Sequence, residues 1–207
     1  MSGSAHWDRA YEERGAETVS WFQAAPDQSL ELICELVSTD EAVIDVGAGA
    51  SRLVDGLLER GYRNVAALDL SGVGLSISMK RLGQKAEQVD WFVADVTRWT
   101  PRRRYQFWHD RAVFHFVTEP ADRADYVASM IASIAPGGYA AISSFAEDGP
   151  EMCSGLRVRR YTPEDLQAEL ESVAPGVFEL LRGEHHVHVT PLGKEQRFQT
   201  SLFRRRP

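Results

Sequence analysis

A short apolar run that passes directly into a loop of small residues is the most constraining feature of this sequence. Residues 43–51 read Val-Ile-Asp-Val-Gly-Ala-Gly-Ala-Ser, so a carboxylate, Asp45, lies two residues before the first glycine. A buried strand that ends in such a loop lets a ligand approach the backbone where the next helix begins. The segment therefore predicts a cofactor-binding turn at the edge of a sheet.

The rest of the chain alternates between helical and strand patterns. Helical spacing of apolar residues covers 26–38, 52–60, 73–82, 120–135 and 163–172, and Pro136-Gly137-Gly138 is expected to end the fourth of these helices. Strand patterns cover 42–46, 64–70, 89–94, 105–109, 139–145, 177–181 and 196–203, with a loop at 146–160. Helical crossovers imply parallel strands, whereas the last two strands have no helix between them. The predicted fold is a doubly wound α/β fold with a mostly parallel seven-stranded sheet and a C-terminal antiparallel hairpin.

Length and composition fit one domain over residues 1–207. Its expected parts are an N-terminal lid and helix (1–38), a cofactor-binding core (39–145) and a substrate-side loop, helix and hairpin (146–207). The net charge of −7 argues against a general nucleic-acid partner, and no stretch approaches the roughly 18 apolar residues of a membrane span. Two cysteines and an N-terminus without signal-peptide features favour the cytoplasm. The oligomeric state is left open.

Charged residues around the glycine loop indicate the cofactor. Arg52 occupies the place of the third glycine of a dinucleotide fingerprint, and no Gly-Lys-Ser/Thr triplet of a P-loop is present. Asp45 would repel a pyrophosphate but would accept an ammonium group. Asp69 and Asp95 end the next two predicted strands, where they could accept from ribose hydroxyls and from the adenine amine, with the Val96 amide donating to the ring. The three acids together predict S-adenosylmethionine, with S-adenosylhomocysteine as product.

With these features the chain resembles the class I S-adenosylmethionine-dependent methyltransferases over nearly its full length. Within that class it looks most like thiopurine S-methyltransferase-like enzymes. The segments that carry this likeness are Trp7-Asp8-Arg9-Ala10-Tyr11, Trp21-Phe22-Gln23, Trp108-His109-Asp110-Arg111-Ala112, the helix with Asp122-Arg123 and Tyr126, and Glu184-His185-His186. The N-terminal Trp-Asp-x-x-Tyr also resembles seven-strand lysine methyltransferases.

The departures from both families bear on the acceptor. His109 is an extra residue within the Trp-Asp pair, and His185 replaces an arginine implicated in substrate binding, so thiopurines are not the expected substrates. His115 replaces the second acid of the lysine enzymes, where a carboxylate would suit an ammonium better. The favoured function is methyl transfer to a small-molecule acceptor such as a thiol or another soft nucleophile. A protein-lysine methyltransferase, a non-catalytic S-adenosylmethionine-binding module and an NAD-type oxidoreductase are the alternatives.

Site residues follow from the motifs and from the chemistry. Alignment of nucleophile, methyl carbon and sulfur supplies most of the rate of such a displacement. Arg111 and His115 are the predicted catalytic residues, although a structural ion pair and a hydrogen-bonded core histidine are the alternatives. The predicted cofactor-binding residues are Trp7, Tyr11, Asp45, Val46, Gly47, Ala48, Gly49, Asp69, Leu70, Asp95, Val96 and Arg111. The predicted substrate-binding residues are Trp21, Phe22, His115 and His185, core packing being the alternative for the aromatic residues. No metal site is expected from His185, His186 and His188.

Overall fold

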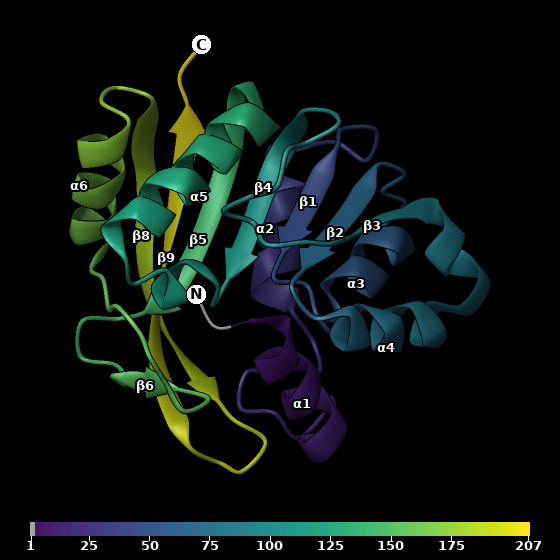
Figure 1. Cartoon of the computed structure of the whole chain (residues 1–207). Helices are drawn as coiled ribbons and strands as arrows, with labels where there is room; N and C mark the ends of the chain where they lie inside the picture. The colour runs from purple at the N-terminus through teal and green to yellow at the C-terminus, as the bar shows by residue number, and fades with distance from the viewer. Residues whose placement is uncertain (1–2) are drawn as a thin grey trace.

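One twisted sheet dominates the structure. The computed structural model describes residues 3–207, which form a seven-stranded sheet of order β3-β2-β1-β4-β5-β9-β8 (Figure 1). The strands β1 to β5 are parallel to one another, whereas β9 is antiparallel to β5 and to β8. The strand bounds are β1 Val43–Val46, β2 Val65–Asp69, β3 Val89–Val93, β4 Tyr105–Arg111, β5 Ile134–Phe145, β8 Phe178–Val189 and β9 Glu195–Arg205. The predicted fold class is confirmed.

Helices cover both faces of the sheet because successive strand residues point to opposite sides. Ile44 and Trp108 face a core that includes α5 and α6, whereas Val43 and Phe107 face one that includes α2, α3 and α4. The helix bounds are α1 Ser4–Arg14, α2 Asp27–Leu36, α3 Leu53–Glu59, α4 Gly72–Leu82, α5 Pro120–Ser133 and α6 Pro163–Val173, with short 3₁₀ helices η1 Gly83–Gln88 and η2 Phe114–Phe116. None of the described helices has the length and apolar character that a membrane span requires.

The elements differ from the sequence prediction in several places; β8, for example, continues to Val189 rather than ending at residue 181. The helix α1 is not among the predicted helices, because it buries only Ala10 and Tyr11 and so lacks an apolar stripe. Residues 136–138 do not end α5; they lie in β5 between Ile134 and Tyr139, where the register against β4 is interrupted. A proline is tolerated there because it has no ladder hydrogen bond to lose. The 146–160 loop contains a two-stranded hairpin, β6 Met152–Cys153 and β7 Leu156–Arg157.

Three segments gather at one end of the sheet. Figure 1 shows α1, β6 and the turn of the β8–β9 hairpin together at the lower end, where β4 ends. The predicted lid segment, residues 1–38, reaches this end, although residues 1 and 2 lie outside the described part of the chain. Residues of α1, of β6 and of the loops after the parallel strands line a common space at this end.

Candidate active site

Two adjoining cavities occupy that space. The first, of about 750 Å³, is lined by Trp7, Tyr11, Val46, Gly47, Asp69, Leu70, Val96 and Arg111, and also by Trp21. The second, of about 530 Å³, is lined by Tyr11, Asp45, Gly47, Ala48 and Arg111, and also by Trp21 and Phe22. The fold thus brings most of the predicted site residues together.

The glycine loop is shaped by close contacts on its inner side. Gly47 has a φ of +71°, and a Cβ there would lie 2.0 Å from Val113 Cγ2. A Cβ on Gly49 would lie 2.1 Å from the hydroxyl oxygen of Tyr11. Gly49 lines neither cavity, so within the described structure its role is to admit Tyr11 rather than to line the ligand space.

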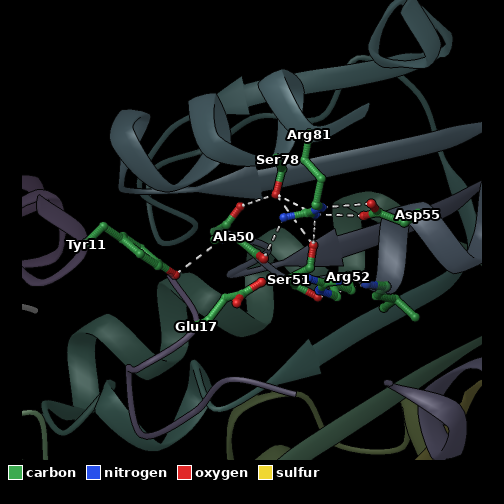
Figure 2. A network of polar contacts seen from close by, with 10 residues as sticks. Tyr11, Glu17, Ala50, Ser51, Arg52, Asp55, Ser78 and Arg81 are labelled. Carbon is green, nitrogen blue, oxygen red and sulfur yellow. Dashed lines mark hydrogen bonds and ion pairs between the residues drawn. The ribbon is translucent and has the colours of Figure 1, made fainter. Parts of the chain in front are cut away.

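The outer side of the same loop is held by α4, as Figure 2 shows. Arg81 donates to the carbonyl oxygens of Ala50 and Ser51, at 3.2 and 2.7 Å, and forms an ion pair with Asp55 at 2.7 Å. The hydroxyl of Ser78 donates to the carbonyl oxygen of Gly49 at 3.0 Å. Because the loop carbonyls are satisfied from outside, the loop keeps one conformation while its inner side faces the cavities.

Asp45 and His109 are neighbours across parallel strands. They are register partners in β1 and β4, and both are buried. Asp45 Oδ1 lies 2.7 Å from His109 Nδ1, and His109 Nε2 lies 2.9 Å from Ser29 Oγ. Asp45 Oδ2 is buried and has no hydrogen-bond partner among residues 3–207. This oxygen could receive a cationic group from a ligand in the second cavity.

Asp69 ends β2 in the first cavity. Its Oδ1 accepts from the Ser71 amide at 2.6 Å, and Ser71 is held in turn by the carboxylate of Asp8, at 2.7 Å, from α1. Burial raises the pKa of Asp69 from 3.8 to about 7, and the backbone amides of Ser71 and Gly49 partly offset this increase. The charged form of a carboxylate removed from water in this way is stabilised by hydrogen bonds from hydroxyl groups such as those of a ribose.

Asp95 follows β3 and forms hydrogen bonds with a residue two positions along the chain. Its Oδ1 accepts from the amide and the hydroxyl of Thr97, at 3.0 and 2.7 Å. Asp95 does not line the first cavity, whereas Ala94 and Val96 on either side of it do. Its predicted contact with an adenine amine remains a prediction.

Arg111 at the end of β4 lies between the two cavities. Its Nη1 donates to the carbonyl oxygen of Trp21 at 2.9 Å, and its guanidinium lies 5.2 Å from the ring centre of Phe198. Its Nε and Nη2 are buried without a hydrogen-bond partner in the described part of the chain. Burial lowers its pKa to about 10, so Arg111 stays charged at neutral pH. An arginine in this state favours an anionic ligand.

Aromatic side chains close the cavities from the N-terminal side. Trp7 contacts Phe116 and Trp21 edge to face, with ring centres 4.9 and 5.7 Å apart. The indole nitrogen of Trp21 donates to the hydroxyl of Tyr11 at 3.3 Å. Phe22 lies in the second cavity with the guanidinium of Arg52 5.8 Å from its ring centre. Trp7 and Trp21 therefore line the ligand space, and Phe22 lies on the side of Asp45.

Two predicted histidines lie away from both cavities. His115 in η2 is completely buried against Phe145, whose amide donates to His115 Nδ1 at 3.3 Å, and burial lowers its pKa to about 3. His185 is exposed on β8 and pairs with Glu147 at 3.1 Å. Neither lines the first or the second cavity as the structure describes them, so this geometry gives no support to a direct role for either.

Other residues reach the site without having been predicted. Val113, Phe116 and Cys153 line the first cavity, and Ser29 and His109 line the second. Cys153 arrives from β6, and nothing local in the sequence places that hairpin. Phe116 follows the predicted Arg111 and His115, so its position in the motif was the available signal. Among residues 3–207 no group of three or more His, Cys, Asp or Glu side chains could hold a metal ion.

Comparison with known proteins gives a family match over the core and structures with a similar fold over nearly the whole chain. A family described as a methyltransferase domain matches residues 43–138. A methyltransferase from Anabaena variabilis described as S-adenosylmethionine-dependent superposes with a TM-score of 0.75, at 15% identity over 100% of this chain and 96% of the other. The Burkholderia thailandensis 1,6-didemethyltoxoflavin-N1-methyltransferase, solved with S-adenosylhomocysteine, has a TM-score of 0.68 at 20% identity over 99% and 84% of the chains. The chain therefore contains a region that matches a methyltransferase domain, and its fold is that of S-adenosylmethionine-dependent methyltransferases.

Two further relatives differ in what they act on. A protein solved in connection with the conversion of a disulfide bond into a thioacetal group during echinomycin biosynthesis has a TM-score of 0.75, at 19% identity over 98% of this chain and 93% of the other chain. The eEF1A lysine and N-terminal methyltransferase of Mus musculus is 25% identical over 97 residues, which are 46% of this chain. The matched region is only 14% of that curated relative.

The residues present fit the groups of S-adenosylmethionine. The unpartnered carboxylate oxygen of Asp45 suits the ammonium of its amino-acid end, and Asp69 suits the ribose. The close contact of Gly47 with Val113 shows that the loop leaves no room for a side chain beside the ligand space. These are the groups that could hold the cofactor across both cavities.

Proposed function

We propose that this methyltransferase transfers a methyl group from S-adenosylmethionine to a small-molecule acceptor with a soft nucleophile, such as a thiol. When bound, the cofactor supplies an electrophilic methyl group on a positively charged sulfur. In this proposal Asp45 receives the ammonium, residues 46–48 face the amino-acid end and the sulfur, and Asp69 receives the ribose. Leu70 and Val96 flank the adenine, and Trp7 and Tyr11 close over the cofactor.

The positive charge beside the acceptor position favours a thiol over a lysine side chain as the methyl acceptor. Trp7, Phe116 and Cys153 form an apolar wall of the first cavity, and Arg111 adds a fixed positive charge beside it. Burial raises the pKa of Cys153 to about 11, so its thiol stays neutral and adds apolar surface. A lysine ammonium would be repelled by Arg111, whereas a thiol would be drawn towards its thiolate form. The likeness to a protein solved for chemistry at a disulfide bond agrees with a sulfur acceptor.

The chain's own contribution is positioning and exclusion of water. Apolar walls exclude water from the reacting groups. Loss of water does not raise the barrier of this reaction, because the negative thiolate and the positive sulfonium both become neutral. Alignment of the acceptor by Trp7, Phe116 and Arg111 lowers the entropic part of the barrier. His115 is not assigned a proton-transfer role in this proposal, because its buried ring lies away from the cavities.

A paired assay tests the acceptor. Purified protein with labelled S-adenosylmethionine is offered a panel of aliphatic and aromatic thiols, phenols and amines, and separately a cell lysate. We expect turnover with thiols and no label in protein bands. Replacing Arg111 by Leu should lower kcat/KM for thiols by about 10–100-fold while Arg111→Lys retains more of it, and the exposed control His185→Gln should change kcat/KM by less than about twofold.

The opposite results point to the alternatives. Label found only in protein bands would replace the proposal with a protein-lysine methyltransferase, for which the curated relative is the precedent. Binding of S-adenosylhomocysteine without turnover of any acceptor would indicate a binding module.

A further inference from the structure

Ser29, His109 and Asp45 form a hydrogen-bonded chain that ends at the second cavity. We propose that His109 and Ser29 are positioning residues that orient the free oxygen of Asp45 as the receptor for the cofactor's ammonium group. The inference rests on the proposed cofactor site, and it gives a function to the extra histidine that separates Trp108 from Asp110.

The first step is the geometry of the chain. Asp45 and His109 are register partners on adjacent parallel strands, so their side chains point to the same face of the sheet. They are 2% and 5% exposed, and Ser29 approaches from the first turn of α2. A carboxylate oxygen only accepts, so Nδ1 of His109 donates to Asp45, and Nε2 forms a hydrogen bond with the Ser29 hydroxyl. Each group thereby fixes the orientation of the next.

The second step is the state of the remaining oxygen. Asp45 Oδ2 is buried and finds no donor anywhere in residues 3–207, which is costly for an ionised group. Asp45 is the one acidic side chain among the described residues that line this cavity, so it is the group there that complements an ammonium. The ammonium belongs to the end of the cofactor that the nucleoside pocket around Asp69 does not hold.

The third step is the need for an anchor. A carboxylate without a fixed partner could rotate about its terminal bond towards the nearby guanidinium of Arg111. The bond from His109 holds one oxygen, and because the group is planar, it fixes where the other points. Ser29 fixes the ring of His109 and links α2, which follows the lid segment, to the sheet.

The test compares two ligands that differ at the amino-acid end. Isothermal titration gives Kd values for S-adenosylhomocysteine and for 5′-methylthioadenosine, which keeps the nucleoside thioether but lacks the amino acid. The variants are His109→Phe, His109→Asn, which retains a donor for Asp45, and Ser29→Ala. The matched control is Tyr62→Phe, which removes a buried hydroxyl that donates to the Val37 carbonyl at 2.8 Å and lines neither the first nor the second cavity.

We expect His109→Phe to raise the Kd of S-adenosylhomocysteine about tenfold and to leave that of 5′-methylthioadenosine within about twofold. His109→Asn and Ser29→Ala should raise the first Kd about threefold, again without affecting the second, and Tyr62→Phe should change neither. A purely structural loss would weaken both ligands equally.

The ratio of the two Kd values decides the outcome. An unchanged ratio in all three variants would overturn the positioning role while leaving the cofactor site intact. If His109→Phe does not fold, the ratios of the other two variants decide in the same way. Failure of the unmodified protein to bind either ligand would overturn the cofactor site and this inference with it.

Discussion

Replacing Asp69 by Asn should stabilise the ligand-free protein and weaken cofactor binding. Burial raises the Asp69 pKa from 3.8 to about 7, so the folded state holds this proton more tightly than the unfolded chain does. The folded state therefore loses stability as the pH rises from about 4 to about 7, and the loss is complete above that range. At about 1.4 kcal/mol per pH unit the upper bound is about 4 kcal/mol. Since the side chain lines a cavity open to solvent, about 1–2 kcal/mol is expected at pH 8.

Two measurements follow from this reasoning. Urea unfolding at pH 8 should show Asp69→Asn to be more stable than the unmodified protein by about 1–2 kcal/mol, and the difference should shrink to roughly a third at pH 5. Titration with S-adenosylhomocysteine at pH 8 should give a Kd about 10–100-fold higher, because an amide whose oxygen stays on the Ser71 amide presents an NH2 donor to the ribose hydroxyls in place of an acceptor oxygen. Asn can still accept from the Ser71 amide, so the local turn is retained.

A surface carboxylate provides the control. Asp90 pairs with Arg103 at 2.9 Å and is more than half exposed, so Asp90→Asn should change stability by less than about 0.5 kcal/mol at either pH. Equal effects of Asp69→Asn at pH 5 and pH 8 would refute the burial argument. An unchanged Kd for S-adenosylhomocysteine would refute the ribose assignment.

Three further substitutions probe the glycine loop, the lid and the turn after β4. Gly47→Ala places a Cβ 2.0 Å from a valine methyl at a φ of +71°, and we expect urea unfolding to show a loss of at least about 2 kcal/mol, with wild-type stability as the contrary result. Arg52→Ala removes an exposed ion pair with Glu17, 2.7 Å long, so the free energy of unfolding should change by less than about 1 kcal/mol. If this ion pair holds the lid closed, stopped flow should show faster release of S-adenosylhomocysteine from Arg52→Ala, and Glu17→Ala should show the same increase. Ala112 has a φ of +69°, so Ala112→Gly should keep or raise the free energy of unfolding, whereas Ala141→Gly in buried β5 should lower it by about 1 kcal/mol; the reverse order would contradict the strain argument.

The predictable parts of the site are those that depend on a few consecutive residues. The apolar run before Gly47 places Asp45 at a strand end, and the same reasoning places Asp69 in the first cavity. Sequence motifs do not predict which side chains face the ligand where a short turn sets the direction of each side chain. His115 and Phe116 are adjacent in η2, yet Phe116 lines the cavity while His115 is buried behind it. Periodicity does not resolve a three-residue turn, so a motif cannot show which of the two faces the ligand.

The sequence alone determined the order of helices and strands, the glycine loop and the acids that follow successive strands. These features are local, because apolar periodicity and small residues act within one element. Only the tertiary structure decided the partners of those acids. Ser29, Asp45 and His109 lie on α2, β1 and β4, and their hydrogen bonds span up to 80 positions of sequence separation. The register between parallel strands and the docking of a helix set such contacts, and both depend on how the whole core packs.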